Sequence, residues 1–173
     1  LGWPRGVDSL KLGALTLSRL AIPGHTQDST AYLLNDGAGL RLAFVGDTVM
    51  PGALGRSDFE QSAPQDYGSS LRRLQQTVGA NTLLLPGHDY DDRFASTLGV
   101  EAIAQPLLGD VLNGRVDDAG FAAAKARLEQ CLALTEYQTV AFGARVDRAC
   151  PLASSELSLS ALPQLTREHP GLV

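Results

Sequence analysis

Three short segments place a potential metal ligand directly after a glycine, where an apolar stretch ends. The segments read AIPGHT, AFVGDT and LLPGHDY, and the residues after their glycines are His25, Asp47 and His88. Ligands at strand ends are held by the sheet and leave room beyond it for substrate. Imidazole with carboxylate is the ligand set of zinc hydrolases and of non-haem iron sites with open positions. The three segments therefore predict a metal centre.

The scarcity of histidine supports interpreting the three segments together as one metal centre. Taken singly, a histidine in a PGH turn is typical of a surface or capping residue, and a GD pair is typical of a turn. The chain has only three histidines, however, and two of them occupy these positions, while His169 lies near the last residue. The preceding glycine has a use in each segment, since it lets the backbone turn sharply and approach a ligand closely.

The pattern of apolar residues predicts an α/β layered architecture. Strands are expected between Leu10 and Ile22 and over 31–34, 40–45 and 81–85, with a hairpin turn at 35–37 and a long loop over 50–65. Helices are expected over 67–78, weakly over 102–108, and over 117–135. Strands and helices alternate along the chain, which favours layers of helices packed on a sheet.

Composition argues against several classes of partner. The 173 residues are 44% hydrophobic with a net charge of -5, so nucleic-acid binding is not expected. No apolar run approaches the roughly 20 residues that span a bilayer, so we expect no membrane partner. The two cysteines, Cys131 and Cys150, form no disulfide framework, and we expect Cys131 to be a small buried side chain. A reducing cytoplasm fits these features.

The motifs resemble those of the metallo-β-lactamase superfamily, with PGHT at 23–26, GDT at 46–48 and PGHDY at 86–90. Within it, GRSDFE at 55–60 resembles the GRTDF segment of persulfide dioxygenases, and glyoxalase II is the related alternative. This resemblance implies the αββα sandwich of that superfamily. Residues 1–152 would form its C-terminal half.

The resemblance also implies a chemistry, in which one iron(II) ion adds dioxygen to glutathione persulfide and yields sulfite and glutathione. His25 and Asp47 would be iron ligands, and His88 would lie beside the metal with a catalytic role. In a glyoxalase II-like enzyme with zinc, His88 would instead bind a second metal ion. Tyr90 would hydrogen-bond substrate or oxygen, or would be an amphipathic rim residue. Arg56 would form a buried pair with Asp58 that shapes the loop, which we favour, or would attract a glutathione carboxylate.

One feature departs from the family pattern. The first metal motif of the superfamily, HxHxDH, lies upstream of these segments, and no histidine precedes His25. His25 and Asp47 supply two of the three ligands of a facial triad. We therefore expect the N-terminal half of the same domain as a partner, with a homodimer left open; a metal-free, non-catalytic module is the third alternative. Residues 153–173 resemble a linker or the start of a rhodanese-like domain.

Overall fold

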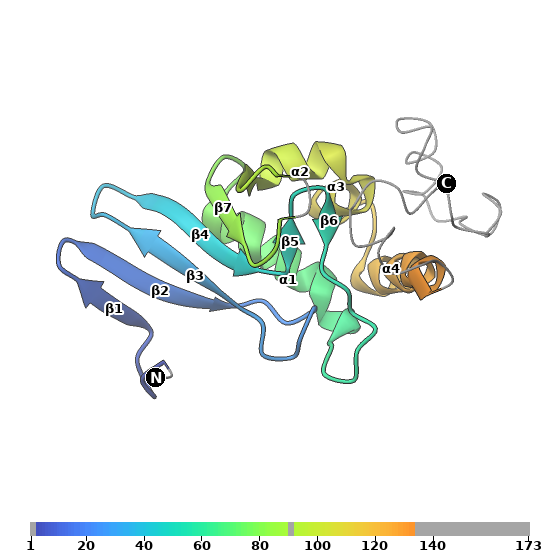
Figure 1. The fold of residues 1–173 in the computed structure, drawn as a ribbon, viewed down its shortest axis with the longest axis horizontal. Coiled ribbons are helices and arrows are strands. Elements are labelled where there is room, and N and C mark those ends of the chain that lie inside the picture. The colour runs from blue at the N-terminus through green and yellow to red at the C-terminus, as the bar shows by residue number, and fades with distance from the viewer. Residues whose placement is uncertain (1–2, 90–91, 134–173) are drawn as a thin grey trace.

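A six-stranded mixed sheet carries the fold in the computed structural model, which describes residues 3–89 and 92–133. The strands are β1 (Ser9–Leu12), β2 (Leu15–Ala21), β3 (Thr30–Asn35), β4 (Leu40–Gly46), β7 (Leu83–Pro86) and β8 (Ser96–Thr97), in this spatial order. A separate two-stranded sheet pairs β5 (Val49–Met50) with β6 (Ala53–Leu54). Figure 1 shows the β1–β4 strands extending away from the helices, which gather at the other end of the molecule.

The direction of one strand pair brings two sequence motifs to the same sheet edge. β1 to β4 pair antiparallel, and the turn between β3 and β4 includes a hydrogen bond from Asp36 N–H to the Gly39 carbonyl. β4 and β7 pair in parallel, so both strands end at the same edge. A parallel pair needs a crossover connection, and the helix α1 (Pro64–Val78) lies in that connection.

The hydrophobic core lies between the sheet and the helices. Alternate residues of the central strands are buried, namely Ala31, Leu33, Ala43, Val45 and Leu84. From α1, the side chains of Tyr67, Leu71, Leu74 and Val78 recur at helical spacing and are buried in the same core. The amphipathic helix expected over 67–78 is therefore observed, with its first turn beginning three residues earlier at Pro64.

The remaining helices are α2 (Leu98–Ala104), α3 (Pro106–Leu112) and α4 (Asp118–Ala133). The single weak helix expected over 102–108 is wrong, because the chain forms two helices that meet at Gln105. Pro106 explains the break: proline disfavours helical backbone in the residue before it and is well suited to the first turn of a new helix. The loop expected over 50–65 likewise contains part of the β5–β6 hairpin.

The other face of the sheet is also apolar. Five apolar side chains of this face, called here the open sheet face, are Tyr32, Leu42, Phe44, Leu83 and Leu85, which lie opposite one another in the strand register, and Arg19 of β2 lies beside Tyr32. Phe44 and Leu83 are 42% and 43% exposed. A sheet face that meets water normally carries polar residues, so this composition is typical of a face that packs against another layer.

Several expectations concern residues outside the described part of the chain. They are the role of Tyr90 and the linker or rhodanese-like character of 153–173. Cys131 lies in α4, but its side chain is not among those described. Among the described helices, none combines the length and the apolar character required to cross a membrane.

Candidate metal centre

The three predicted ligands come together at the ends of their segments. The parallel β4 and β7 end side by side, and the Gly87 N–H donates to the Gly46 carbonyl at 2.8 Å. Nδ1 of His88 lies 2.6 Å from Oδ1 of Asp47, and Nε2 of His25 lies 3.6 Å from Oδ2 of Asp47. Each carboxylate oxygen of Asp47 therefore faces a different imidazole.

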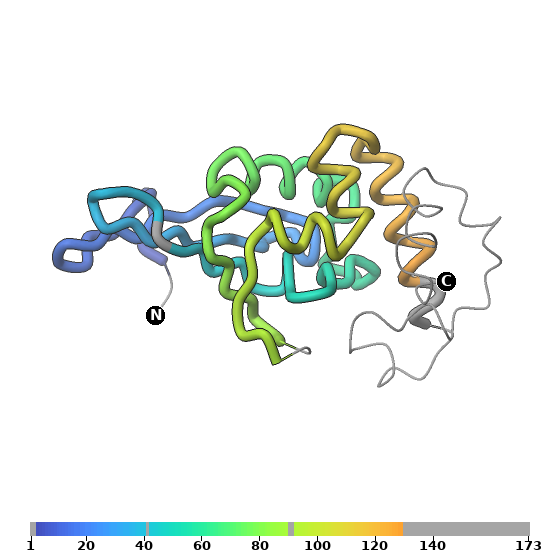
Figure 2. The backbone as a smooth tube through the Cα atoms, turned by 90° about the horizontal axis from the view of Figure 1, so that it is seen from above, coloured from blue at the N-terminus to red at the C-terminus, as the bar shows by residue number. Residues whose placement is uncertain are grey.

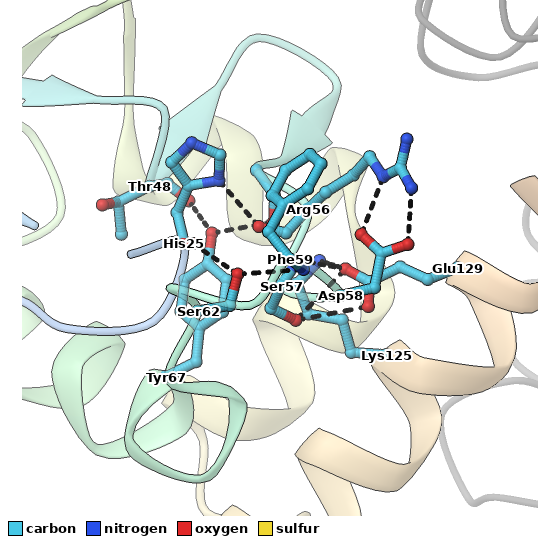
Figure 3. Close-up of polar contacts among 11 residues, drawn as sticks. His25, Thr48, Arg56, Ser57, Asp58, Phe59, Ser62, Tyr67, Lys125 and Glu129 are labelled. Carbon is cyan, nitrogen blue, oxygen red and sulfur yellow. Dashed lines mark hydrogen bonds and ion pairs between the residues drawn. The ribbon is translucent and has the colours of Figure 1, made fainter. Parts of the chain in front are cut away.

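The orientation of the His25 ring is set by a backbone carbonyl. Nδ1 of His25 lies 2.7 Å from the Arg56 carbonyl oxygen, which can only accept, so Nδ1 carries the proton. The Ser62 hydroxyl donates to the backbone carbonyl of His25 at 2.7 Å and holds the main chain of the same loop. Figure 3 shows these contacts converging on His25. In the neutral ring with this tautomer, Nε2 carries the lone pair, and it lies 3.6 Å from Asp47 Oδ2.

This arrangement fits two positions of a metal site. Metal-binding histidines commonly donate their second ring N–H to a carbonyl or carboxylate, as His25 does to Arg56. The 3.6 Å between His25 Nε2 and Asp47 Oδ2 is too long for a hydrogen bond. It is close to the spacing of two ligands of one ion, since each ligand lies about 2.0–2.2 Å from the metal. His25 and Asp47 therefore suit a shared metal ion.

Two glycines allow this close approach. Gly46 has a φ of 54°, in the left-handed region that favours glycine, and it turns β4 so that Asp47 leaves the sheet. A Cβ atom at Gly87 would lie only 2.6 Å from Asp47 Oδ1, in the space beside the His88 contact. Gly46 thus permits the sharp turn that was expected, and Gly87 permits the expected close contact.

The pair of Arg56 and Asp58 forms at the side of the site. Nε of Arg56 donates to Asp58 Oδ1 at 2.8 Å, and Nη2 donates to the second carboxylate oxygen. Hydrogen bonding to Arg56 lowers the pKa of the Asp58 carboxyl against the opposing effect of its burial. The Arg56 guanidinium also lies over the Phe59 ring, 4.9 Å from its centroid. The structural pairing is therefore present, although its side chains are partly exposed rather than buried.

A buried polar layer beneath the site was not predicted from the sequence. It consists of Tyr67 on α1, Lys125 and Glu129 on α4, and Ser57 in the loop after Arg56. The sequence did contain a signal for this polar layer. Tyr67 lies on the apolar stripe of α1, and a buried tyrosine needs a partner for its hydroxyl. Lys125 and Glu129 are spaced i,i+4 beside the apolar positions of α4.

The described residues do not by themselves make up a full metal site. Within residues 3–89 and 92–133, no group of three or more His, Cys, Asp or Glu side chains is arranged to hold a metal ion. The structure brings His25, Asp47 and His88 together and places the Arg56 backbone against His25, whereas Tyr90 lies outside the described residues. The metal roles of His25, Asp47 and His88 thus remain proposals.

Sequence comparison finds two kinds of enzyme among the relatives. The chain is 34% identical over 101 residues to the mitochondrial persulfide dioxygenase ETHE1 of Bos taurus, a match covering 58% of this chain and 39% of that protein. It is 41% identical over 96 residues to the hydroxyacylglutathione hydrolase of Methylobacillus flagellatus, covering 55% and 35%. The match spans about two fifths of the length of these curated relatives. No protein-family model matches the chain.

Structure comparison identifies the fold. The crystal structure of ETHE1 from Myxococcus xanthus matches with a TM-score of 0.57 and 27% identity, covering 95% of this chain and 58% of that chain. A metallo-β-lactamase from Staphylococcus aureus matches with a TM-score of 0.59 and 25% identity, covering 72% and 38%. The expected fold is thereby confirmed, in a form that corresponds to part of those larger chains.

Proposed function

We propose that this chain, which belongs to the metallo-β-lactamase superfamily, supplies part of the metal site of an iron-dependent persulfide dioxygenase acting on glutathione persulfide. The observation that carries the proposal is that the two carboxylate oxygens of Asp47 face two different histidines. One carboxylate oxygen accepts from His88 Nδ1, and the other faces His25 Nε2. This geometry supports one metal position beside Asp47, with His88 steadying the carboxylate.

His25 and Asp47 would bind the metal, and their neighbours would orient the two ligand atoms. His25 presents Nε2 because its Nδ1–H is bonded to the Arg56 carbonyl, and Asp47 presents Oδ2. When bound, iron(II) supplies open positions at which dioxygen and the persulfide sulfur can react. His88, with a 56% exposed side chain, lies at the solvent side of Asp47. We propose that His88 contacts substrate or oxygen there; a contact of Tyr90 with either one is proposed from the sequence alone.

The remaining ligand would come from the N-terminal half of the domain, which would carry the HxHxDH motif. The open sheet face supports this proposal, because Phe44 and Leu83 expose apolar area that a second layer would bury. That layer would approach the sheet from the face opposite the helices. A site assembled from two halves would also account for the incomplete ligand set of His25 and Asp47.

Metal analysis and oxygen uptake test the function. The complete natural protein that contains this chain should hold one iron ion and convert glutathione persulfide, dioxygen and water to glutathione and sulfite, with the third sulfite oxygen coming from water. His25→Ala should lose the iron and the uptake, because it removes a ligand. The matched control, His169→Ala, removes the histidine for which no metal role is proposed and should keep both. Unchanged oxygen uptake in His25→Ala would remove His25 from the mechanism.

A zinc-dependent thioester hydrolase is the second candidate, favoured by the similarity to hydroxyacylglutathione hydrolases. In that enzyme class a metal-bound hydroxide attacks the thioester. Two zinc ions per chain and hydrolysis of a glutathione thioester would support this candidate instead. A complete protein that binds no metal and shows neither activity would support the non-catalytic module.

A further inference from the structure

The Tyr67 ring lies directly beneath the site. Its side chain is fully buried on α1 and packs edge-on against Phe121 of α4, with 5.7 Å between ring centroids. On its other side the ring touches the backbone of Gly24, where an added Cβ would overlap the ring atoms. Since Gly24 precedes His25, the Tyr67 ring supports the main chain that carries this candidate ligand.

The Tyr67 hydroxyl reaches the other two segments of the site. It donates to the Thr48 carbonyl at 2.6 Å, and the Gly55 carbonyl lies 3.3 Å away. Thr48 follows Asp47, and Gly55 precedes the Arg56 carbonyl that orients His25. One side chain therefore contacts the neighbours of both candidate ligands and of the carbonyl that orients one of them; Figure 3 shows the contact with Thr48.

A buried ion pair holds the same loop from its other side. The Glu129 carboxylate accepts from the Ser57 N–H at 2.6 Å and from the Ser57 hydroxyl at 3.1 Å. Lys125 Nζ lies 2.7 Å from Glu129 and 5.3 Å from the Tyr67 ring centroid. The peptide groups on both sides of Arg56 are thus tied to helices, through Gly55 to α1 and through Ser57 to α4.

We propose that Tyr67 is a positioning residue that sets the placement of His25 relative to Asp47, assisted by Glu129; this inference rests on the proposed metal role of the two ligands. Tyr67 does not act through substrate, because it is fully buried. It acts through the backbone, by keeping the 3.6 Å between His25 Nε2 and Asp47 Oδ2. Metal ligands must be held within about 0.5 Å of their working geometry, so a loosened loop should weaken binding.

The conservative variant Tyr67→Phe removes only the hydroxyl and keeps the ring on Gly24. In the complete natural protein, titrated with Co²⁺ alone and followed by its visible absorption, this variant should bind about 10–100-fold more weakly. Its cobalt spectrum should also change, because the ligand geometry changes. The matched control is Thr77→Val, which removes a hydroxyl that donates to the Arg73 carbonyl on the exposed side of the same helix, and should leave affinity and spectrum unaltered. Circular dichroism at the working temperature checks that each variant is folded.

Nitrogen NMR of the metal-free protein provides a readout independent of metal binding. The wild type should show His25 with its proton on Nδ1, and Tyr67→Phe should show a mixture of tautomers as the Arg56 carbonyl loosens. Glu129→Gln, acting on the same loop through Ser57, should shift the tautomer in the same direction.

The outcomes separate the two proposals. If the wild type and His25→Ala bind Co²⁺ equally, the proposed metal role fails, while the tautomer of His25 still decides the role of Tyr67. If wild-type binding depends on His25 but Tyr67→Phe keeps the affinity, the spectrum and the tautomer, the positioning role is overturned. A lower melting temperature with these three readouts unchanged would assign Tyr67 to stability alone, which also overturns the proposal.

Discussion

His88 Nδ1 donates a hydrogen bond of 2.6 Å to Asp47 Oδ1, although the two residues are 41 positions apart in the chain. If this contact steadies the carboxylate of a single metal site, His88→Ala should keep one metal ion but bind it about 10–100-fold more weakly. His25→Ala should lose the ion. Metal content by mass spectrometry distinguishes the classes, since a two-metal hydrolase would lose one ion of two on His88→Ala.

The closeness of Gly87 to Asp47 predicts a steric effect. In Gly87→Ala the new Cβ would lie 2.6 Å from Asp47 Oδ1, so the carboxylate or the His88 loop must shift. Overpacking of this kind costs about 1–3 kcal/mol of unfolding free energy, and metal affinity should fall as well. Gly13→Ala, in the β1–β2 turn with open space around it, is the control. It should cost about 1 kcal/mol from backbone strain without changing metal affinity. Equal metal affinity in both variants would contradict the prediction.

The pairing of Arg56 with Asp58 makes a prediction about substrate binding. If Arg56 serves mainly to shape the loop, Arg56→Gln and Asp58→Asn should impair the enzyme similarly, and the double variant should be no worse than either. If Arg56 instead binds the substrate carboxylate, Arg56→Gln alone should raise KM for glutathione persulfide. Steady-state kinetics of the three variants in the complete protein separates these cases. We expect the first result, with a coupling energy of about 0.5–3 kcal/mol.

The burial of Tyr67 predicts an alkaline loss of stability. Burial, followed by the nearby Glu129 carboxylate, raises the pKa of the Tyr67 hydroxyl well above 10.0. The folded state then keeps a proton that the unfolded state loses above pH 10, so stability falls as pH rises, by up to about 1.4 kcal/mol per pH unit. Tyr67→Phe should be less stable near neutral pH but lose stability less steeply above pH 10. Denaturant unfolding at a series of pH values measures how steeply the unfolding free energy of the wild type and of Tyr67→Phe falls.

The pKa of Lys125 shifts in the opposite direction to that of Tyr67, so Lys125 provides an internal check on the pH dependence of stability. Burial lowers the pKa of its ammonium group from 10.5, against the favourable effect of Glu129. The unfolded state then binds more protons below pH 10.5, so the contribution of Lys125 to stability increases as pH rises to that value. Tyr67→Phe should keep this increase. An alkaline slope identical to that of the wild type would show that Tyr67 does not cause the loss.

The open sheet face predicts sensitivity to charge. In the complete protein, Phe44→Lys should lower the unfolding free energy by about 2 kcal/mol or more, because the N-terminal half would bury the ammonium group. Val100→Lys is the matched control, since Val100 is 49% exposed on α2 and Phe44 is 42% exposed. The control should change stability by about 0.5 kcal/mol or less. Similar stability of the two variants would mean that Phe44 meets water in the intact protein.

Local sequence pattern determined the elements that end at the site. Apolar stretches ending in glycine predicted the strand ends that precede Asp47 and His88, and the helical recurrence of Leu71, Leu74 and Val78 predicted α1. The break at Gln105 was missed because apolar residues continue on both sides of it, although Pro106 carried the signal for a break.

Tertiary structure alone decided how those residues meet. The parallel pairing of β4 with β7 brings Asp47 beside His88, and parallel pairing is not encoded in either strand by itself. The contact between Ser57 and Glu129 spans 72 positions, so no local periodicity could indicate it. Sequence specifies which side chains leave a strand at its end, since that depends on neighbouring residues. Which atoms then face each other depends on packing between distant segments, and this packing places Tyr67 under both candidate ligands.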